Sequence, residues 1–175
     1  AYNQLVKLKQ KGKVELHKEE HLDRTFSILK IFWKQSVRVF LVELINEVVI
    51  EPHLNTSWRK IEMSDFKDCE EIWHVGDIGT LDVIEKLETV CPVRAVFGNI
   101  DGQDIRIRYP EHQKFTMNGV HVWLTHIGGY PGRYNPQIRE EVYRLKPDLF
   151  VCGHSHILKV MRDKKTPNLL HMNPG

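Results

Sequence analysis

The stretch Leu149-Phe150-Val151-Cys152-Gly153-His154-Ser155-His156 joins a short apolar run to a glycine and two histidines. Three stretches upstream have the same form, an apolar run that stops at a polar residue able to bind a metal: residues 72–77, 93–99 and 120–126. Buried parallel strands have near-continuous apolar sequences, and in open α/β sheets the reactive groups collect at the carboxyl ends of the strands. We therefore expect one site that contains Asp77, Asn99, His126, His154 and His156.

These five side chains offer imidazole nitrogens, a carboxylate and an amide oxygen, but no thiolate. Such a set suits catalytic divalent ions, such as manganese, zinc or iron, better than a closed structural zinc site. His154 and His156 alternate about Ser155, so in an extended chain they share a face and both can reach a metal. The sequence therefore predicts a catalytic metal site.

Two helices are predicted between these strands. Residues 81–90 carry apolar side chains at helical spacing, and a second apolar stripe over 136–145 follows Asn135, a favourable cap, and stops before Pro147. Helices that alternate with buried strands favour a largely parallel sheet with right-handed connections. Such a sheet would bring all four strand ends to one rim.

The first part of the chain is less regular. Leu22, Phe26, Leu29 and Trp33 have helical spacing and predict a helix, whereas the alternation over 37–41 predicts a strand. Residues 1–47 are treated as a divergent or unassigned segment, and residues 48–175 as one domain.

Composition limits the possible functions. The 175 residues suit a single domain, and a net charge of +2 is too small to imply nucleic-acid or membrane binding through bulk electrostatics. The three cysteines lack zinc-like or redox-like spacing, which indicates buried apolar residues in a reducing compartment. We therefore expect a cytoplasmic protein that does not act on membranes, and nucleic acid is not its expected partner.

Four motifs together resemble those of the calcineurin-like metallophosphoesterases, in particular the small, single-domain phosphodiesterases. The resemblance covers roughly residues 64–175 and rests on Gly76-Asp77-Ile78-Gly79, Gly98-Asn99-Ile100-Asp101, Thr125-His126-Ile127-Gly128-Gly129 and Gly153-His154-Ser155-His156, followed by Asn173-Pro174-Gly175. It implies an α/β fold of the metallophosphoesterase type, a β-sandwich of mixed sheets flanked by helices.

The resemblance also implies a site with two divalent metal ions. Manganese is the expected ion, with zinc, nickel, iron and magnesium as alternatives. Asp77 resembles the family's bridging carboxylate, Asn99 and Asp77 its catalytic pair, and the histidines its remaining ligands: His126 and His154 for one metal and His156 for the other. In this family a metal-bridging hydroxide attacks the phosphorus.

The chain departs from the family pattern at three places. The family begins with an Asp-x-His motif that is absent here; Glu51 and His53, after the apolar run 48–50, are candidate substitutes, and a surface turn is the alternative. Many members carry a histidine general acid where this chain has Ile100, which favours diesters or other substrates with good leaving groups. The family usually continues beyond the motif at 173–175 into further strands, so the domain is expected to lack C-terminal strands.

The resulting prediction is a metal-dependent phosphodiesterase that acts on a small phosphodiester. The alternative is a non-catalytic scaffold with a degenerate metal site, because relatives of this fold include a retromer subunit that serves as a binding platform. A weaker alternative is nucleic-acid binding through the lysines over 7–13. Apolar surface left open by missing strands would favour a homo-oligomer.

Overall fold

The computed structural model describes residues 14–18, 27–33, 37–43 and 70–174. In chain order the elements are β1 (Val14–Lys18), β2 (Ser27–Trp33), β3 (Val37–Glu43), β4 (Glu71–His74), α2 (Leu81–Glu88), β5 (Val93–Ala95), α3 (Gln103–Arg108), β6 (His112–Met117), β7 (Val120–Thr125), β8 (Gly129–Tyr130), β9 (Arg133–Tyr134), α4 (Pro136–Leu145), β10 (Leu149–Val151), β11 (Lys159–Arg162) and β12 (Leu170–Asn173).

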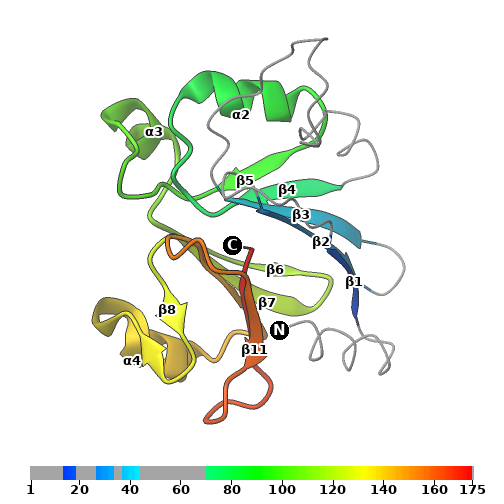
Figure 1. The fold of residues 1–175 in the computed structure, drawn as a ribbon, viewed down its shortest axis with the longest axis vertical. Coiled ribbons are helices and arrows are strands. Elements are labelled where there is room, and N and C mark those ends of the chain that lie inside the picture. Colours follow the sequence, from blue (N-terminus) through cyan, green and yellow to red (C-terminus); the bar gives the residue numbers. More distant parts are fainter. Residues whose placement is uncertain (1–13, 19–26, 34–36, 44–69, 175) are drawn as a thin grey trace.

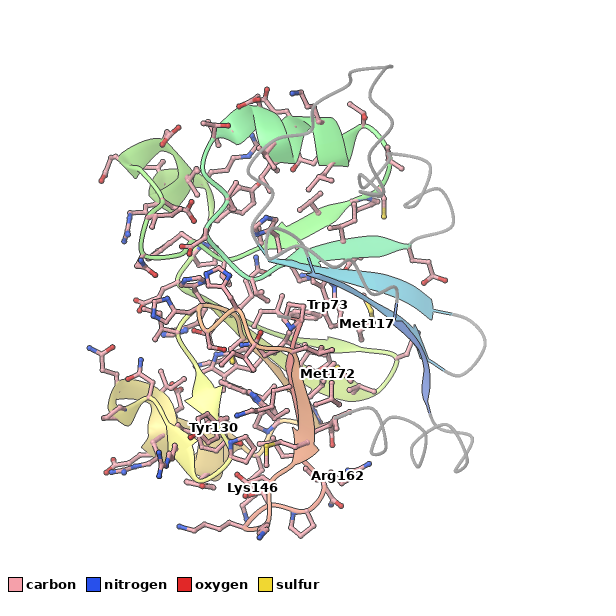
Figure 2. The ribbon with its side chains drawn as sticks, in the orientation of Figure 1. Trp73, Met117, Tyr130, Lys146, Arg162 and Met172 are labelled. Carbon is pink, nitrogen blue, oxygen red and sulfur yellow. The ribbon has the colours of Figure 1, made fainter. Side chains whose placement is uncertain are left out.

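Two five-stranded sheets form the framework, in the orders β1-β2-β3-β4-β5 and β11-β12-β10-β7-β6. They pack face to face (Figure 1), and the apolar layer between them includes Trp73 and Val75 from the first sheet and Met172 from the second. Figure 2 shows Trp73 and Met172 between the sheets, with Met117 beside them. Both sheets mix parallel and antiparallel pairs, which confirms the predicted α/β sandwich of mixed sheets.

The four strands that carry the motifs do not lie in one sheet. β4 and β5 are parallel neighbours in the first sheet, and β7 and β10 are parallel neighbours in the second. The prediction of a single, largely parallel sheet with all four ends on its rim is therefore wrong. The antiparallel hairpin of β6 and β7 lies in the second sheet, and its two-residue turn is formed by Asn118 and Gly119, both with positive φ.

Helices cover the outer faces of both sheets. α2 packs Ile84 and Leu87 with Ile72 of β4, whereas α4 packs Ile138 and Val142 against the second sheet. Side chains alternate along β7 as expected for a strand buried on both faces, because its valines face the other sheet while its tryptophan faces α4. The two predicted helices are confirmed, and the Asn135 side chain caps α4 by accepting a hydrogen bond from the Gln137 N–H at 3.0 Å.

The helix predicted from Leu22 to Trp33 is wrong over the part that is described, because residues 27–33 form β2. Leu29 and Trp33 are four residues apart, and this spacing places two side chains on one face of a strand as well as of a helix. The strand predicted over 37–41 is confirmed as β3, which pairs with β4 in parallel. The apolar run 48–50 lies outside the described residues.

Within the described residues, the helices are all too short or too polar to cross a membrane.

Candidate metal centre

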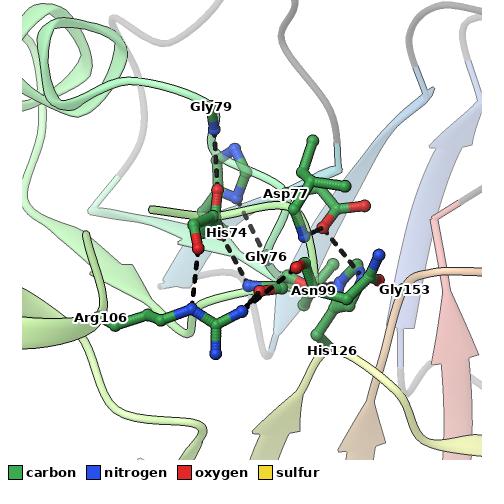
Figure 3. Close-up of polar contacts among 12 residues, drawn as sticks. His74, Gly76, Asp77, Gly79, Asn99, Arg106, His126 and Gly153 are labelled. Atoms are coloured by element: carbon green, nitrogen blue, oxygen red, sulfur yellow. Dashed lines mark hydrogen bonds and ion pairs between the residues drawn. The ribbon is translucent and has the colours of Figure 1, made fainter. Parts of the chain in front are cut away.

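The loops after β4, β5, β7 and β10 bring side chains from both sheets together. Asp77 follows β4 and Asn99 follows β5, whereas His126 and His154 follow β7 and β10. The ligand atoms of Asp77, His126 and His154 all lie within 4.8 Å of one another. Asn99 belongs to the same place, since its Oδ1 lies 3.0 Å from His126 Nε2 (Figure 3).

His126 has one ring nitrogen fixed by the backbone. Its Nδ1 lies 2.7 Å from the Val75 carbonyl oxygen, which can only accept, so Nδ1 carries the proton. In the neutral ring, Nε2 then presents a lone pair to Asp77 Oδ1 at 3.2 Å and to the Asn99 oxygen. A cation among these three atoms, either a second proton on the ring or a metal ion, would stabilise this arrangement. A backbone bond at the other ring nitrogen is also the usual arrangement of a metal-binding histidine.

Asp77 is only 5% exposed, yet its surroundings favour the carboxylate. Burial by itself raises the pKa of the Asp77 carboxyl, but the hydrogen bond and positive charge of a protonated His126 ring outweigh burial and hold the pKa below its ordinary value. A deprotonated carboxylate beside imidazole and amide ligands fits a divalent metal ion. The donor set is therefore compatible with the metals expected from the sequence.

Two glycines make room for these side chains. A Cβ on Gly98 would lie 2.1 Å from Asp77 Oδ1, and a Cβ on Gly76 would lie 2.6 Å from His126 Nδ1. Gly76 also has a φ of +98°, which a residue with a side chain rarely adopts. The glycines before Asp77 and Asn99 are therefore required for the close approach of the two loops.

Asp101 is a positioning residue to which the sequence analysis gave no role. It is 4% exposed, and its carboxylate accepts hydrogen bonds from the Gly79 N–H at 2.8 Å and the Gly98 N–H at 2.6 Å. Arg106 holds the same loop, donating to the Asp101 and Asn99 carbonyl oxygens at 2.7 and 3.2 Å. Asp101 thus ties the loop of Asp77 to the loop of Asn99. Its position in the sequence, two residues after Asn99, is the feature that could have indicated this role.

The His-x-His segment is not extended. His154 has a φ of +70° and His156 a φ of +49°, so the argument that both share one face of a strand does not hold. Asn173 supports the turn, because its Nδ2 donates to the Gly153 carbonyl oxygen and to Ser155 Oγ, each at 3.0 Å. His154 joins the three-residue group, whereas His156 is exposed and is not part of it.

His74 lies next to the centre but has a different role. It is fully buried, with its Nδ1 accepting the Gly76 N–H at 3.3 Å. Burial lowers the pKa of His74 to about 4, against the opposing charge of Asp101. His74 is therefore a neutral support for the glycine turn. Glu51 and His53, the candidate substitutes for the missing ligands, lie outside the described residues.

Comparison with known proteins identifies the family of this chain. Residues 51–175 match the family described as the calcineurin-like phosphoesterase superfamily domain, and the chain belongs to that family. A "Probable metallophosphoesterase" from Methanothermobacter thermautotrophicus is 32% identical over 110 residues, which are 63% of this chain and 62% of that protein. The chain thus spans less than two thirds of the length of this relative.

Solved structures show the same fold at lower identity. Wild-type Vps29 from Entamoeba histolytica, complexed with Zn²⁺, aligns with a TM-score of 0.55 and 16% identity, over 78% of this chain and 73% of that one. An archaeal phosphodiesterase aligns with a TM-score of 0.51 and 22% identity, over 65% of this chain and 72% of that one.

Proposed function

We propose that this protein is a metal-dependent phosphoesterase whose substrates are small phosphodiesters. The observation that carries the proposal is the convergence of Asp77, Asn99 and His126: His126 Nε2 lies 3.2 Å from Asp77 Oδ1 and 3.0 Å from the Asn99 oxygen, while its Nδ1 is bound to the Val75 carbonyl oxygen. Support comes from the family, the name of the Methanothermobacter thermautotrophicus relative and the archaeal phosphodiesterase with the same fold.

The residues have separate tasks in this proposal. Asp77, Asn99, His126 and His154 would hold one divalent ion, with manganese as the proposed metal, and Asp77 together with His156 would serve a second. When bound, divalent ions activate water and offset the negative charge of a phosphate. The chain itself keeps Asp77 deprotonated, fixes the orientation of His126 through the Val75 carbonyl, and holds the Asn99 loop through Asp101.

Ile100 supports diesters as the substrate class. It follows Asn99 directly, its backbone N–H donates to Asp77 Oδ1 at 3.4 Å, and its side chain has no proton to give. A positioned acid accelerates departure of a poor leaving group by about a hundredfold or more. Without one at this position, we expect the enzyme to favour esters whose alcohol is a good leaving group.

The test is hydrolysis of bis(p-nitrophenyl) phosphate by metal-stripped protein titrated with Mn²⁺. We expect saturable activity that falls at least a hundredfold in Asp77→Asn. The matched control is Asp82→Asn on α2, where the same change is made to an exposed carboxylate whose side chain is 61% accessible, and this variant should retain full activity. Activity that survives in Asp77→Asn, or none at any Mn²⁺ concentration, would contradict the proposal.

The alternative proposal is a protein-binding scaffold, and one observation favours it. The likeness to Vps29 extends over 78% of this chain, further than the likeness to the archaeal phosphodiesterase at 65%. A scaffold would bind Mn²⁺ through Asp77 and His126 without turnover of any phosphoester. Calorimetric Mn²⁺ binding measured beside the hydrolysis assay therefore distinguishes the two functions.

A further inference from the structure

Arg106 binds the loop that carries Asn99 through a single guanidinium group. It lies on α3 and is exposed. Its Nε donates to the Asp101 carbonyl oxygen at 2.7 Å, and its Nη2 donates to the Gly98 and Asn99 carbonyl oxygens at 3.0 and 3.2 Å (Figure 3). Its Cζ also lies 4.4 Å from the centroid of the Phe97 ring. Three N–H groups of an exposed arginine are therefore bound to one short loop.

The two carbonyls bound by Nη2 belong to the peptide groups on either side of the Asn99 Cα. The Gly98 carbonyl is part of the peptide group before Asn99, and the Asn99 carbonyl is part of the peptide group after it. Each peptide group is planar, so the backbone at Asn99 has only two rotations, φ and ψ, between these groups. Holding both carbonyls restrains both rotations, and with them the direction of the Cα–Cβ bond. Arg106 thus restrains the direction in which the Asn99 side chain leaves the loop.

This direction matters because the Asn99 side chain reaches the candidate metal centre. Asn99 Oδ1 lies 3.0 Å from His126 Nε2. The carboxylate of Asp101 also holds the loop, but it accepts the Gly98 N–H at 2.6 Å, which is one peptide group further from the Asn99 Cα. The contacts of Arg106 are therefore the ones next to Asn99 itself.

We propose that Arg106 is a positioning residue that orients Asn99 for metal binding. This inference rests on the proposed function and adds a residue to its site. A guanidinium is planar and presents its donors in a fixed fork, whereas a lysine ammonium is a compact charge on a flexible stem. The positive charge of Arg106 opposes the binding of a nearby cation, so its contribution to metal affinity is geometric and not electrostatic.

The test is calorimetric binding of Mn²⁺ to metal-stripped protein. We expect Arg106→Ala to weaken binding about tenfold, the lower end of the effect of removing a group that supports a metal ligand. Loss of the charge alone would strengthen binding, so weaker binding reports orientation. Arg106→Lys keeps the charge but not the fork, and it should lose as much affinity. The matched control is Arg108→Ala on the same helix, whose guanidinium pairs with Glu88 at 2.6 Å; this variant should bind Mn²⁺ as the wild type does.

A double variant tests whether Arg106 acts through Asn99. In the Asn99→Ala background, Arg106→Ala should have no further effect on Mn²⁺ affinity, because the side chain that it orients is gone. Thermal denaturation of the metal-free variants checks that each is folded. Unchanged affinity in Arg106→Ala, full affinity in Arg106→Lys, or a further tenfold loss in the double variant would overturn the positioning role. Failure of the proposed function is a separate result, since a protein that shows the expected affinities but hydrolyses no diester retains the role of Arg106 and is not the enzyme.

Discussion

Replacing Asp101 by alanine should destabilise the fold and loosen the candidate metal centre together. The substitution removes the acceptor of two backbone N–H groups, those of Gly98 at 2.6 Å and Gly79 at 2.8 Å. Gly98 is buried, so no water would replace the carboxylate as the acceptor of its N–H. A buried donor without an acceptor lowers the free energy of unfolding by about 1–3 kcal/mol. Gly79 is exposed, so water can bind its N–H in the variant. Loss of this second hydrogen bond therefore costs about 1 kcal/mol, the net contribution of an ordinary hydrogen bond. We expect a total of about 3 kcal/mol.

Thermal and urea denaturation of the metal-free protein measure this loss. For a chain of this length 1 kcal/mol shifts the melting temperature by about 2–4 °C, so Asp101→Ala should melt about 6–12 °C lower. Asp101→Asn keeps one acceptor oxygen and should lose about half as much. Glu140→Ala, which removes an exposed carboxylate from α4, should stay within about 0.5 kcal/mol of the wild type. A loss below about 1 kcal/mol in Asp101→Ala would refute the positioning role of this carboxylate.

Three further predictions concern the loops, a buried histidine and an ion pair. Gly98→Ala would place a Cβ 2.1 Å from Asp77 Oδ1 and should weaken Mn²⁺ binding at least tenfold by calorimetry; Gly119→Ala, with nothing within 4 Å of its Cβ, should leave that affinity unchanged. Burial lowers the pKa of His171 to about 3, so protons bind the unfolded chain preferentially. Stability should therefore fall as the pH drops from about 6.5 toward 3, and His171→Phe should flatten this fall in urea denaturation; an unchanged slope would contradict the assignment. Glu71 accepts a tryptophan N–H at 2.6 Å and two arginine N–H groups at 3.1 and 2.6 Å, so Glu71→Gln should lose about 1–2 kcal/mol in the same assay, and unaltered stability would show that the ion pair contributes nothing.

The convergence of the centre could be predicted because it depends on strand ends. Asp77, Asn99, His126 and His154 each follow a buried apolar run, and apolar runs of that length have few structures other than a central strand. Parallel neighbours share the edge at which they end, so the side chains after them meet even though the sheet order was predicted wrongly. The division of these strands between two sheets could not be predicted from the sequence, because the hydrophobic periodicity of a buried strand does not show which strands are its neighbours.

The role of Asp101 and the bend at His154 depend on backbone geometry that residue types specify only weakly. The period of two along a strand predicts that His154 and His156 share a face, but this inference assumes extended φ and ψ. Likewise, a carboxylate after an Asn-Ile pair is an ordinary turn residue unless N–H groups of its own loop and of a second loop point at it. Both features became visible only with φ angles and donor positions.

The distribution of positive φ angles gives an independent argument that the loops are shaped for ligands. The non-glycine residues with positive φ in the described part of the chain are Asp77, Asn118, Lys146, His154 and His156. Asn118 forms a hairpin turn and Lys146 ends α4, and both are places where left-handed backbone is ordinary. The remaining three are proposed metal ligands, and each left-handed residue with a side chain costs about 1–3 kcal/mol. Left-handed backbone at those three is expected when a site selects the direction of side chains over local stability. The hydrogen bonds of Asp101 and Asn173 offset that strain by holding the neighbouring loops in place.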